Sequence, residues 1–306
     1  MTAPGKCWRD GEIVALDDVA LGVDSAGTRY SVVVFDGLAA VPAADGRRVR
    51  ILDLPAHLAR FARSCDALGL ELRYDEARLT EAVLEVAADH PVDTPAGIRL
   101  FAYATGEDYL DREPTSVCVF LRGLAGYAPD RPLRLAVADA RRPARTDLPR
   151  WIKATAHYAG TRRSVLAARA AGADDALFLN EHGRVTEASR ASLVVLCDEG
   201  LVAPPVEEGV LPGITRTLLA RVAEAAFGWR VEYRPLELDE VLAADGALLC
   251  SSSLGAGTVG AIDGYALPTD RAAALAAAFT AAARGVTSHL DAVATVLDVA
   301  SPAVAA

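Results

Sequence analysis

A lysine at position 153 stands out from the other basic residues of the chain. The 306-residue sequence has 31 Lys and Arg, and Lys6 and Lys153 are its two lysines. Lys153 lies in WIKATAHYAG (151–160), between large apolar residues and small ones. Burial lowers the pKa of an amine and frees its lone pair for attack on an aldehyde, whereas an arginine keeps its proton. One interpretation is therefore a lysine that binds an aldehyde covalently. The other is a surface lysine whose stem packs on apolar neighbours.

A glutamate 34 residues after this lysine is a second candidate. Glu187 ends a strand-like run in RVTEAS (184–189) and is flanked by small residues. Beside a ring nitrogen, a buried carboxylate holds the proton on that nitrogen and makes the ring a better electron acceptor. The simpler alternative is a solvated acid in a turn.

Two stretches have the features of an anion site. In LPGITR (211–216), Pro and Gly precede Ile214 and Thr215 at the expected start of a helix, where free N–H groups and the helix dipole attract anions. In HLAR (57–60), Arg60 has apolar neighbours and is able to fork onto a phosphate. An ordinary helix start and a packed surface arginine are the respective alternatives.

The elements that must position these residues alternate between helical and strand periodicity, which is typical of a mixed α/β protein. Expected helices cover 56–70, 75–90, 165–172, 210–228 and 271–286. Expected strands cover 97–105, 116–122, 133–138, 176–180, 192–197, 230–236 and 246–253. The Gly- and Pro-rich stretch GYAPDRP (126–132) breaks the pattern and predicts a linker.

In their order along the chain, these motifs resemble the fold-type IV pyridoxal-phosphate enzymes. These are the class IV aminotransferases, which include branched-chain and D-amino-acid aminotransferases and aminodeoxychorismate lyase. The resemblance begins at TRYSVVVFDGL (28–38), continues through HLARFARS, DLPRWIKATAHYAG, AGADDALFLNEHGRVTEAS and LPGITR, and ends at SSSLGAGTVGAIDG (251–264). It implies an α/β (α+β) enzyme with a small N-terminal α/β domain (1–126), an interdomain linker (127–139) and a larger C-terminal pseudo-barrel domain (140–306) that binds pyridoxal 5'-phosphate.

The resemblance also implies a role for individual residues. Lys153 would bond to the cofactor and shuttle the proton, Glu187 would pair with the pyridine nitrogen, and Tyr158 would donate to the phenolic oxygen. The phosphate would be bound by Arg60, Gly213, Ile214, Thr215 and a hydroxyl from Ser252 or Ser253. Tyr30, Phe35 and Arg99 would line the substrate pocket, with Arg99 the candidate for a substrate carboxylate. An ordinary strand-edge arginine is the alternative for Arg99.

The substrate side departs from the family pattern. Ala39 stands near the position of an arginine that branched-chain enzymes usually carry, and Gly97 replaces an aromatic residue. Ser192 replaces the Asn usually found after the glutamate, and Ser252 and Ser253 occupy positions where a Thr is common. Thr105 occupies the position of an arginine that many lyase and D-amino-acid members carry. The cofactor side is thus well matched and the substrate side is not diagnostic.

The function we predict is a ping-pong transfer of an amino group between an L-amino acid, apolar or glutamate, and a 2-oxo acid. Two alternatives within the family are a pyridoxal-phosphate lyase and a D-amino-acid aminotransferase. A third, from another class, is a non-catalytic ligand-binding member, although that role gives no reason to keep Lys153, Tyr158 and Glu187 together.

Composition argues against other classes of partner. The net charge of −10 disfavours nucleic acids and anionic membrane surfaces. Five scattered cysteines without CxxC spacing indicate reduced thiols, and no apolar run is long enough for a signal peptide or a membrane span. The five histidines lack metal-ligand spacing, so no metal is expected. GxSxG is absent, and GAGTVG lacks the helix and acid of a dinucleotide site. We predict a cytoplasmic protein acting on small molecules, and the family resemblance implies a homodimer.

Overall fold

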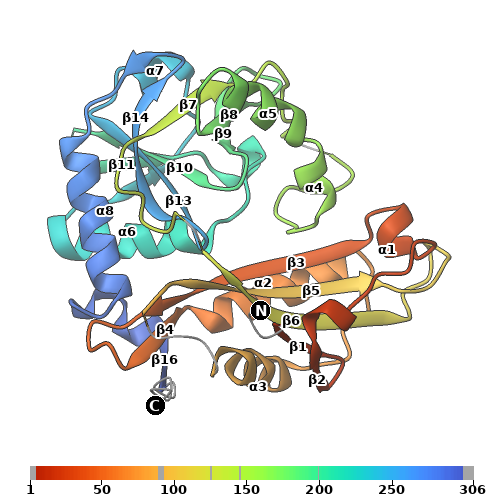
Figure 1. The fold of residues 1–306 in the computed structure, drawn as a ribbon. Coiled ribbons are helices and arrows are strands. Elements are labelled where there is room, and N and C mark those ends of the chain that lie inside the picture. The colour runs from red at the N-terminus through yellow and green to blue at the C-terminus, as the bar shows by residue number, and fades with distance from the viewer. Residues whose placement is uncertain (1–4, 89–92, 125, 145, 199, 299–306) are drawn as a thin grey trace.

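The structure is a computed structural model that describes residues 5–88, 93–124, 126–144, 146–198 and 200–298. Its elements form two sheets, one below the other in Figure 1, each with helices packed against it. The mixed α/β class predicted from the alternating periodicity is confirmed.

The first sheet has seven strands in the order β16-β4-β3-β5-β6-β1-β2, and every neighbouring pair is antiparallel. The strands are β1 (Lys6–Arg9), β2 (Glu12–Ala15), β3 (Val33–Pro42), β4 (Arg48–Leu52), β5 (Ala96–Ala104), β6 (Thr115–Gly123) and β16 (Ala294–Asp298). The register of β3 and β5 places Gly37 opposite Arg99. Both residues of this pair line the cavity described below.

Helices α2 (Leu54–Ala67) and α3 (Glu76–Ala87) pack against this sheet, while the short α1 (Ala26–Arg29) lies at the end of β5 (Figure 1). In α2, Leu54, Leu58, Phe61 and Cys65 recur at helical spacing and are all buried in one core cluster. This apolar stripe fixes the rotation of α2, and its position therefore decides where His57 and Arg60 of the same helix lie.

The second sheet is barrel-like. Its strands follow the order β12-β11-β10-β13-β14-β7-β8-β9, and a further pairing of β9 with β10 at Glu187 and Ser192 closes the path. Its members are β7 (Leu133–Val137), β8 (Asp175–Leu179), β9 (Val185–Ala188), β10 (Ser192–Cys197), β11 (Gly200–Ala203), β12 (Val231–Tyr233), β13 (Gly246–Ser251) and β14 (Gly255–Ile262), with β15 (Tyr265–Ala266) attached to β14.

The remaining helices surround this barrel. They are α4 (Ala156–Ala159), α5 (Arg162–Ala170), α6 (Ile214–Phe227), α7 (Leu238–Leu242) and α8 (Asp270–Ala283), with the 3-10 turns η2 (Val206–Glu208) and η3 (Ser288–Val293). A further 3-10 turn, η1 (Leu16–Asp18), follows β2 of the first sheet. Helices α6 and α8 pack on each other and bury a second core cluster with β10, β11 and β13. Among the described residues, no helix has the length and apolar character needed to cross a membrane.

The chain crosses between the two sheets twice. After β6 it passes through GYAPDRP into β7, which lies inside the segment 127–139 predicted as a linker and pairs with β8 and β14 of the barrel. After η3 the chain returns, and β16 pairs with β4 at the edge of the first sheet (Figure 1). The first sheet is therefore built from both ends of the described chain. The domain boundaries themselves remain a proposal.

Candidate active site

A cavity of about 280 Å³ lies where the two sheets face each other. Its lining brings together most of the predicted site residues: Phe35, Arg60, Arg99, Lys153, Tyr158, Glu187, Gly213, Ile214, Thr215, Ser252 and Ser253. They come from the first sheet, from α2, from α4 and the loop before it, from the β9–β10 hairpin, from the start of α6 and from the β13–β14 turn. Tyr30 is the one predicted residue outside this lining, and its side chain is half-exposed.

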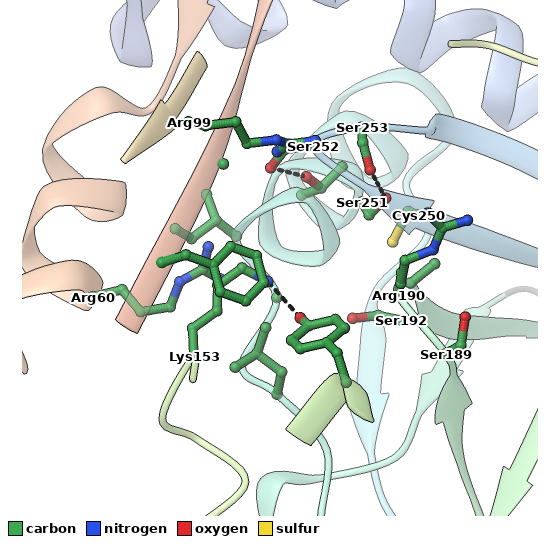
Figure 2. A pocket seen from close by; sticks show the side chains of 18 of the residues that line it. Arg60, Arg99, Lys153, Ser189, Arg190, Ser192, Cys250, Ser251, Ser252 and Ser253 are labelled. Carbon is green, nitrogen blue, oxygen red and sulfur yellow. Dashed lines mark hydrogen bonds between the residues drawn. The ribbon is translucent and has the colours of Figure 1, made fainter. Parts of the chain in front are cut away.

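Lys153 points into the cavity from the loop between β7 and α4 (Figure 2). Its Nζ lies 2.8 Å from the hydroxyl of Tyr158 and 4.8 Å from the centre of the Phe35 ring. The Lys153 backbone is tied to the first sheet, because its N–H donates to Ser64 Oγ at 3.1 Å and its carbonyl accepts from the Phe35 N–H at 3.0 Å. The Lys153 backbone is thus held by two hydrogen bonds, and its partly buried amine is held by a third, to the Tyr158 hydroxyl.

Glu187 is the carboxylate of the cavity and is held by an arginine. Arg142 Nη1 donates to Glu187 Oε1 at 2.8 Å, and the side chains of both residues are largely buried. The N–H of Leu211 donates to the other oxygen at 3.4 Å. Arg142 also lies over the ring of Phe178, 4.7 Å from its centre. The ion pair and the backbone donor fix the orientation of the carboxylate beside the cavity.

The start of α6 forms the anion-binding end of the cavity. Gly213 is the N-cap residue, and the Thr215 hydroxyl lies 3.3 Å from Ser252 Oγ (Figure 2). A Cβ on Gly213 would lie 2.6 Å from Ser192 Oγ, which explains why glycine stands at this position. Ser253 Oγ lies 3.3 Å from Ser251 Oγ. Two hydroxyls and the free N–H groups of a helix start therefore converge on one spot.

Arg60 reaches the same region from α2, but a buried carboxylate takes two of its donors. Its Nε and Nη2 donate to Asp36 at 2.8 Å each, and Nη1 lies 3.4 Å from the carbonyl of Pro212, close to the start of α6. Asp36 also accepts from His57 Nδ1 at 2.7 Å, and His57 Nε2 lies 3.5 Å from Ser252 Oγ. Asp36, His57 and Arg60 thus form one buried network, hereafter the Asp36 network.

The electrostatics of the Asp36 network follow from burial. Burial by itself would raise the pKa of Asp36, but Arg60 and His57 outweigh it and hold that pKa well below its usual range. Burial lowers the pKa of His57 despite the neighbouring Asp36, so the imidazole is neutral near pH 7. Burial opposes the charge of Arg60, yet the Asp36 carboxylate raises its pKa. The network is consequently one carboxylate, one guanidinium and one neutral ring.

Asp36 and His57 were not among the predicted site residues, although both stand inside the quoted motifs FDGL and HLAR. A clue was available, since an aspartate within the apolar run VVVFDGLAAV needs a buried cation as partner. Arg142, Arg122 and Arg190 were also missed. In a chain this rich in arginine, residue type alone does not distinguish them from surface arginines.

The family model described as amino-transferase class IV matches residues 34–262, about three quarters of the chain. The chain belongs to the class IV aminotransferases. Among curated relatives, the branched-chain-amino-acid aminotransferase of Pseudomonas aeruginosa is 24% identical over 275 residues, which cover 87% of this chain and 88% of that protein.

Solved class IV aminotransferases have the same fold. A branched-chain aminotransferase from Thermoproteus uzoniensis, solved with norvaline, superimposes with a TM-score of 0.89 at 27% identity and covers 95% of this chain and 99% of that one. A T.th. branched-chain amino acid aminotransferase, complexed with N-(5'-phosphopyridoxyl)-L-glutamate, gives a TM-score of 0.87 at 27% identity and covers 96% of this chain and 98% of that one. The predicted family, the fold-type IV architecture and the aminotransferase class of the enzyme are confirmed.

Proposed function

We propose that this class IV aminotransferase uses pyridoxal 5'-phosphate to move an amino group between an L-amino acid and a 2-oxo acid in a ping-pong cycle. The observation that carries the proposal is the occurrence of the Lys153–Tyr158 pair and of Glu187, which Arg142 holds, in the lining of one cavity. The solved T.th. relative, which holds a phosphopyridoxyl-glutamate compound, supports the same cofactor.

The residues of the cavity fit this cofactor on geometric grounds. Gly213 keeps the start of α6 open, because any side chain there would meet Ser192, and the hydroxyls of Thr215 and Ser252 face each other at that end. This end offers the N–H and O–H donors that a phosphate requires. A carboxylate and an amine, both partly buried, stand in the same cavity to meet a ring nitrogen and an aldehyde.

When bound, pyridoxal phosphate supplies an aldehyde that bonds to an amine and a ring that accepts electrons from the substrate Cα. Lys153 would hold the cofactor and then act as the base and acid that moves a proton to and from the substrate. The Tyr158 hydroxyl lies 2.8 Å from Nζ and orients that amine, and it would donate to the phenolic oxygen of the bound cofactor. The Phe35 ring beside Nζ excludes water from one side of the amine.

Glu187 would face the ring nitrogen and keep it protonated. Arg142 and the Leu211 N–H leave this carboxylate little freedom to turn, so it is oriented before the cofactor arrives. Such preorganised charge costs no rearrangement during the reaction. Arg60 would contribute Nη1 to the phosphate end, because Nε and Nη2 already bind Asp36.

Phe35 and Arg99 would form the substrate wall. The Phe35 ring stacks on Phe101, which stacks on Phe120, and the three rings make one side of the cavity apolar. Arg99 lies beside these rings, paired with Phe120 across β5 and β6, and would bind the α-carboxylate of the substrate. The proposed assembly is a cytoplasmic homodimer, in which the exposed Tyr30 would reach the partner's cavity.

The test is an absorption spectrum of purified protein, with Lys153→Ala compared against Lys6→Ala as the matched lysine control. We expect a visible band of lysine-bound pyridoxal phosphate in wild type and in Lys6→Ala, absent in Lys153→Ala. Addition of L- and D-amino acids one at a time should convert this band into that of pyridoxamine phosphate for the true donors. A protein that binds no pyridoxal phosphate after reconstitution would exclude the proposal, and product formation without an added 2-oxo acid would indicate a lyase.

A further inference from the structure

A second cavity, of about 420 Å³, forms a groove between α2 and the start of α3. Its floor contains Leu58, Leu70 and Leu79, which also belong to the buried core of the first sheet. Ala59 and Ala62 lie in the same lining and are exposed, so short side chains leave the groove open along α2. None of the described residues that line it also lines the active-site cavity. This α2–α3 groove is therefore an apolar surface that the proposed function does not use.

Carboxylates surround the α2–α3 groove. Its described lining contains four exposed acidic residues, Asp66, Glu71, Asp75 and Glu76. Arg112 is the one cation of that lining, and its guanidinium lies 3.7 Å from the Asp66 carboxylate. Within the described residues, neither Glu71 nor Glu76 forms an ion pair. The rim of the groove is thus negatively charged, and it favours an occupant with positive charges around an apolar group.

One helix of the barrel has the complementary chemistry. Leu166 of α5 has 49% of its surface exposed, whereas Ala168 of the same helix is buried in a core cluster. Three exposed arginines lie three or four residues from Leu166 and so surround it on the helix surface: Arg162, Arg163 and Arg169. Within the described residues, none of these three side chains forms an ion pair or a hydrogen bond. Helix α5 therefore presents one apolar side chain among unpaired cations.

The groove and this helix lie far apart on one molecule. In Figure 1, α5 covers the barrel in the upper half of the view, and α3 lies below the first sheet at the bottom. One chain therefore cannot place its α5 in its own groove. A contact between the two joins unlike surfaces of two copies, head to tail, and leaves a free helix at one end of the assembly and a free groove at the other.

We propose that α5 of one molecule docks into the α2–α3 groove of a second copy, with Leu166 entering the groove and the surrounding arginines facing its acidic rim. A helix that places an apolar residue in a groove is a common mode of recognition. The acidic rim also suits the start of α5, where Arg162 and Arg163 stand at the positive end of the helix dipole. One apolar anchor and exposed ion pairs make a weak contact, so association should require a high protein concentration and should weaken with salt.

The first experiment is light scattering of the full chain over a range of protein concentrations, at low and at high salt. At low salt, the average mass should rise with concentration beyond the mass found at high dilution, and added salt should lower it again. Leu166→Asp should weaken this association at least about tenfold, because a charge then replaces the apolar anchor in the groove. Val286→Asp, at another exposed apolar residue on the loop after α8, is the matched control and should associate as wild type does.

The second experiment exchanges the charges of the two surfaces. One variant combines Arg162→Glu with Arg163→Glu, and the other combines Glu71→Arg with Glu76→Arg. Each variant alone should associate at least about tenfold more weakly than wild type, because like charges meet at the groove. An equal mixture of the two should associate again, since the acidic α5 of the first then meets the basic groove of the second.

Several outcomes would overturn this inference. One is a mass that stays constant with concentration at low salt, and another is a Leu166→Asp protein or a charge-reversal variant that associates as wild type does. A third is a mixture of the two charge-reversal variants that does not associate, because the arginines and the carboxylates then do not meet. Thermal unfolding followed by circular dichroism should be alike in all variants, which separates loss of the contact from loss of the fold.

Discussion

The Asp36 network is the clearest case in which one residue type is required. Asp36 is fully buried and forms hydrogen bonds with Arg60 and His57, and the backbone N–H of the next residue, Gly37, donates to it at 2.7 Å. A buried guanidinium without a counter-ion is costly, so Asp36 holds Arg60 in position near the start of α6, the proposed phosphate end of the cavity.

Replacement of Asp36 by Asn should lower the free energy of unfolding by about 3–5 kcal/mol, because Arg60 loses its buried counter-ion. Urea unfolding of the apoprotein measures this effect. Asp45→Asn is the matched control, since Asp45 pairs with Arg48 at the surface and its replacement should change stability much less than that of Asp36. Equal losses in the two variants would show that Asp36 is not what neutralises Arg60.

Gly213 allows a test in which one substitution repairs another. The backbone of Gly213 has φ −70° and ψ 122°, which any residue adopts, so the obstacle to alanine is the Ser192 hydroxyl 2.6 Å from the added Cβ. Gly213→Ala should weaken binding of pyridoxal phosphate about tenfold or more, as expected when a helix start is displaced from an anion. The double variant with Ser192→Ala should regain affinity, measured by fluorescence titration of the apoprotein. If the affinity does not recover, contact between the added Cβ and Ser192 is not the cause of the weaker binding.

The short α4 segment connects the lysine to its phenol, and His157 fixes that segment. His157 Nε2 donates to the Pro149 carbonyl at 3.2 Å, and Nδ1 accepts from Arg150 at 3.1 Å, an arrangement that only the neutral ring satisfies. Burial, followed by the charge of Arg150, lowers the pKa of His157 to about 4. Tyr158 is the next residue, so the tautomer of His157 bears on the geometry of the Lys153–Tyr158 pair.

An NMR titration should therefore find the His157 pKa near 4, and Arg150→Met should raise it. The unfolded chain protonates this histidine near pH 6.5. Between pH 6.5 and about 4 the unfolded state binds more protons, so this residue's contribution to stability is complete above pH 6.5 and falls as the pH drops toward 4. His157→Gln should flatten that part of the stability profile. A measured His157 pKa near the ordinary value of about 6.5 would contradict the hydrogen bonds of this ring to Pro149 and Arg150.

Long periodic elements were predictable from the sequence. The expected strand 192–197 coincides with β10, and the expected helices at 56–70 and 271–286 correspond to α2 and α8 within a few residues. The strand β14 was not expected, because its glycines in GAGTVG resemble a loop. In the barrel, Gly257 and Gly260 are needed where Leu133 and Pro132 approach, a reason that exists only after β7 packs beside β14. Tertiary packing overrides local propensity there.

In the site, too, residues in local motifs were predictable, and residues brought together only by tertiary packing were not. Lys153, Tyr158, Glu187 and Gly213 belong to motifs that are recognisable along the chain, and the structure places all four in one cavity. Arg122 comes from β6, and only the pairing of β5 with β6 brings it to Arg99. Contacts between elements far apart in sequence carry no local signal, so Arg122 could not be assigned to the cavity in advance, whereas Phe35 and Arg99 were expected there from the family resemblance.

The arrangement of the two sheets leaves an apolar patch at the α1 end of the first sheet. Tyr30 and Tyr109 contact each other with ring centres 5.2 Å apart, and the adjacent Leu110 has 72% of its surface exposed. In the proposed homodimer, burial of this patch would carry Tyr30, which lies outside the cavity of its own chain, toward the partner's cavity.

Light scattering should give the mass of a dimer for wild type, and Leu110→Asp should shift the mass toward that of a monomer at low concentration. Burying an unpaired charge costs at least about 2 kcal/mol, on the order of 30-fold in the dissociation constant. Val286→Asp, similarly exposed but on the loop after α8, should leave the dimer intact. Aminotransfer should fall with dissociation, since Tyr30 then no longer reaches the second site. A dimer that withstands Leu110→Asp would place the interface on another face.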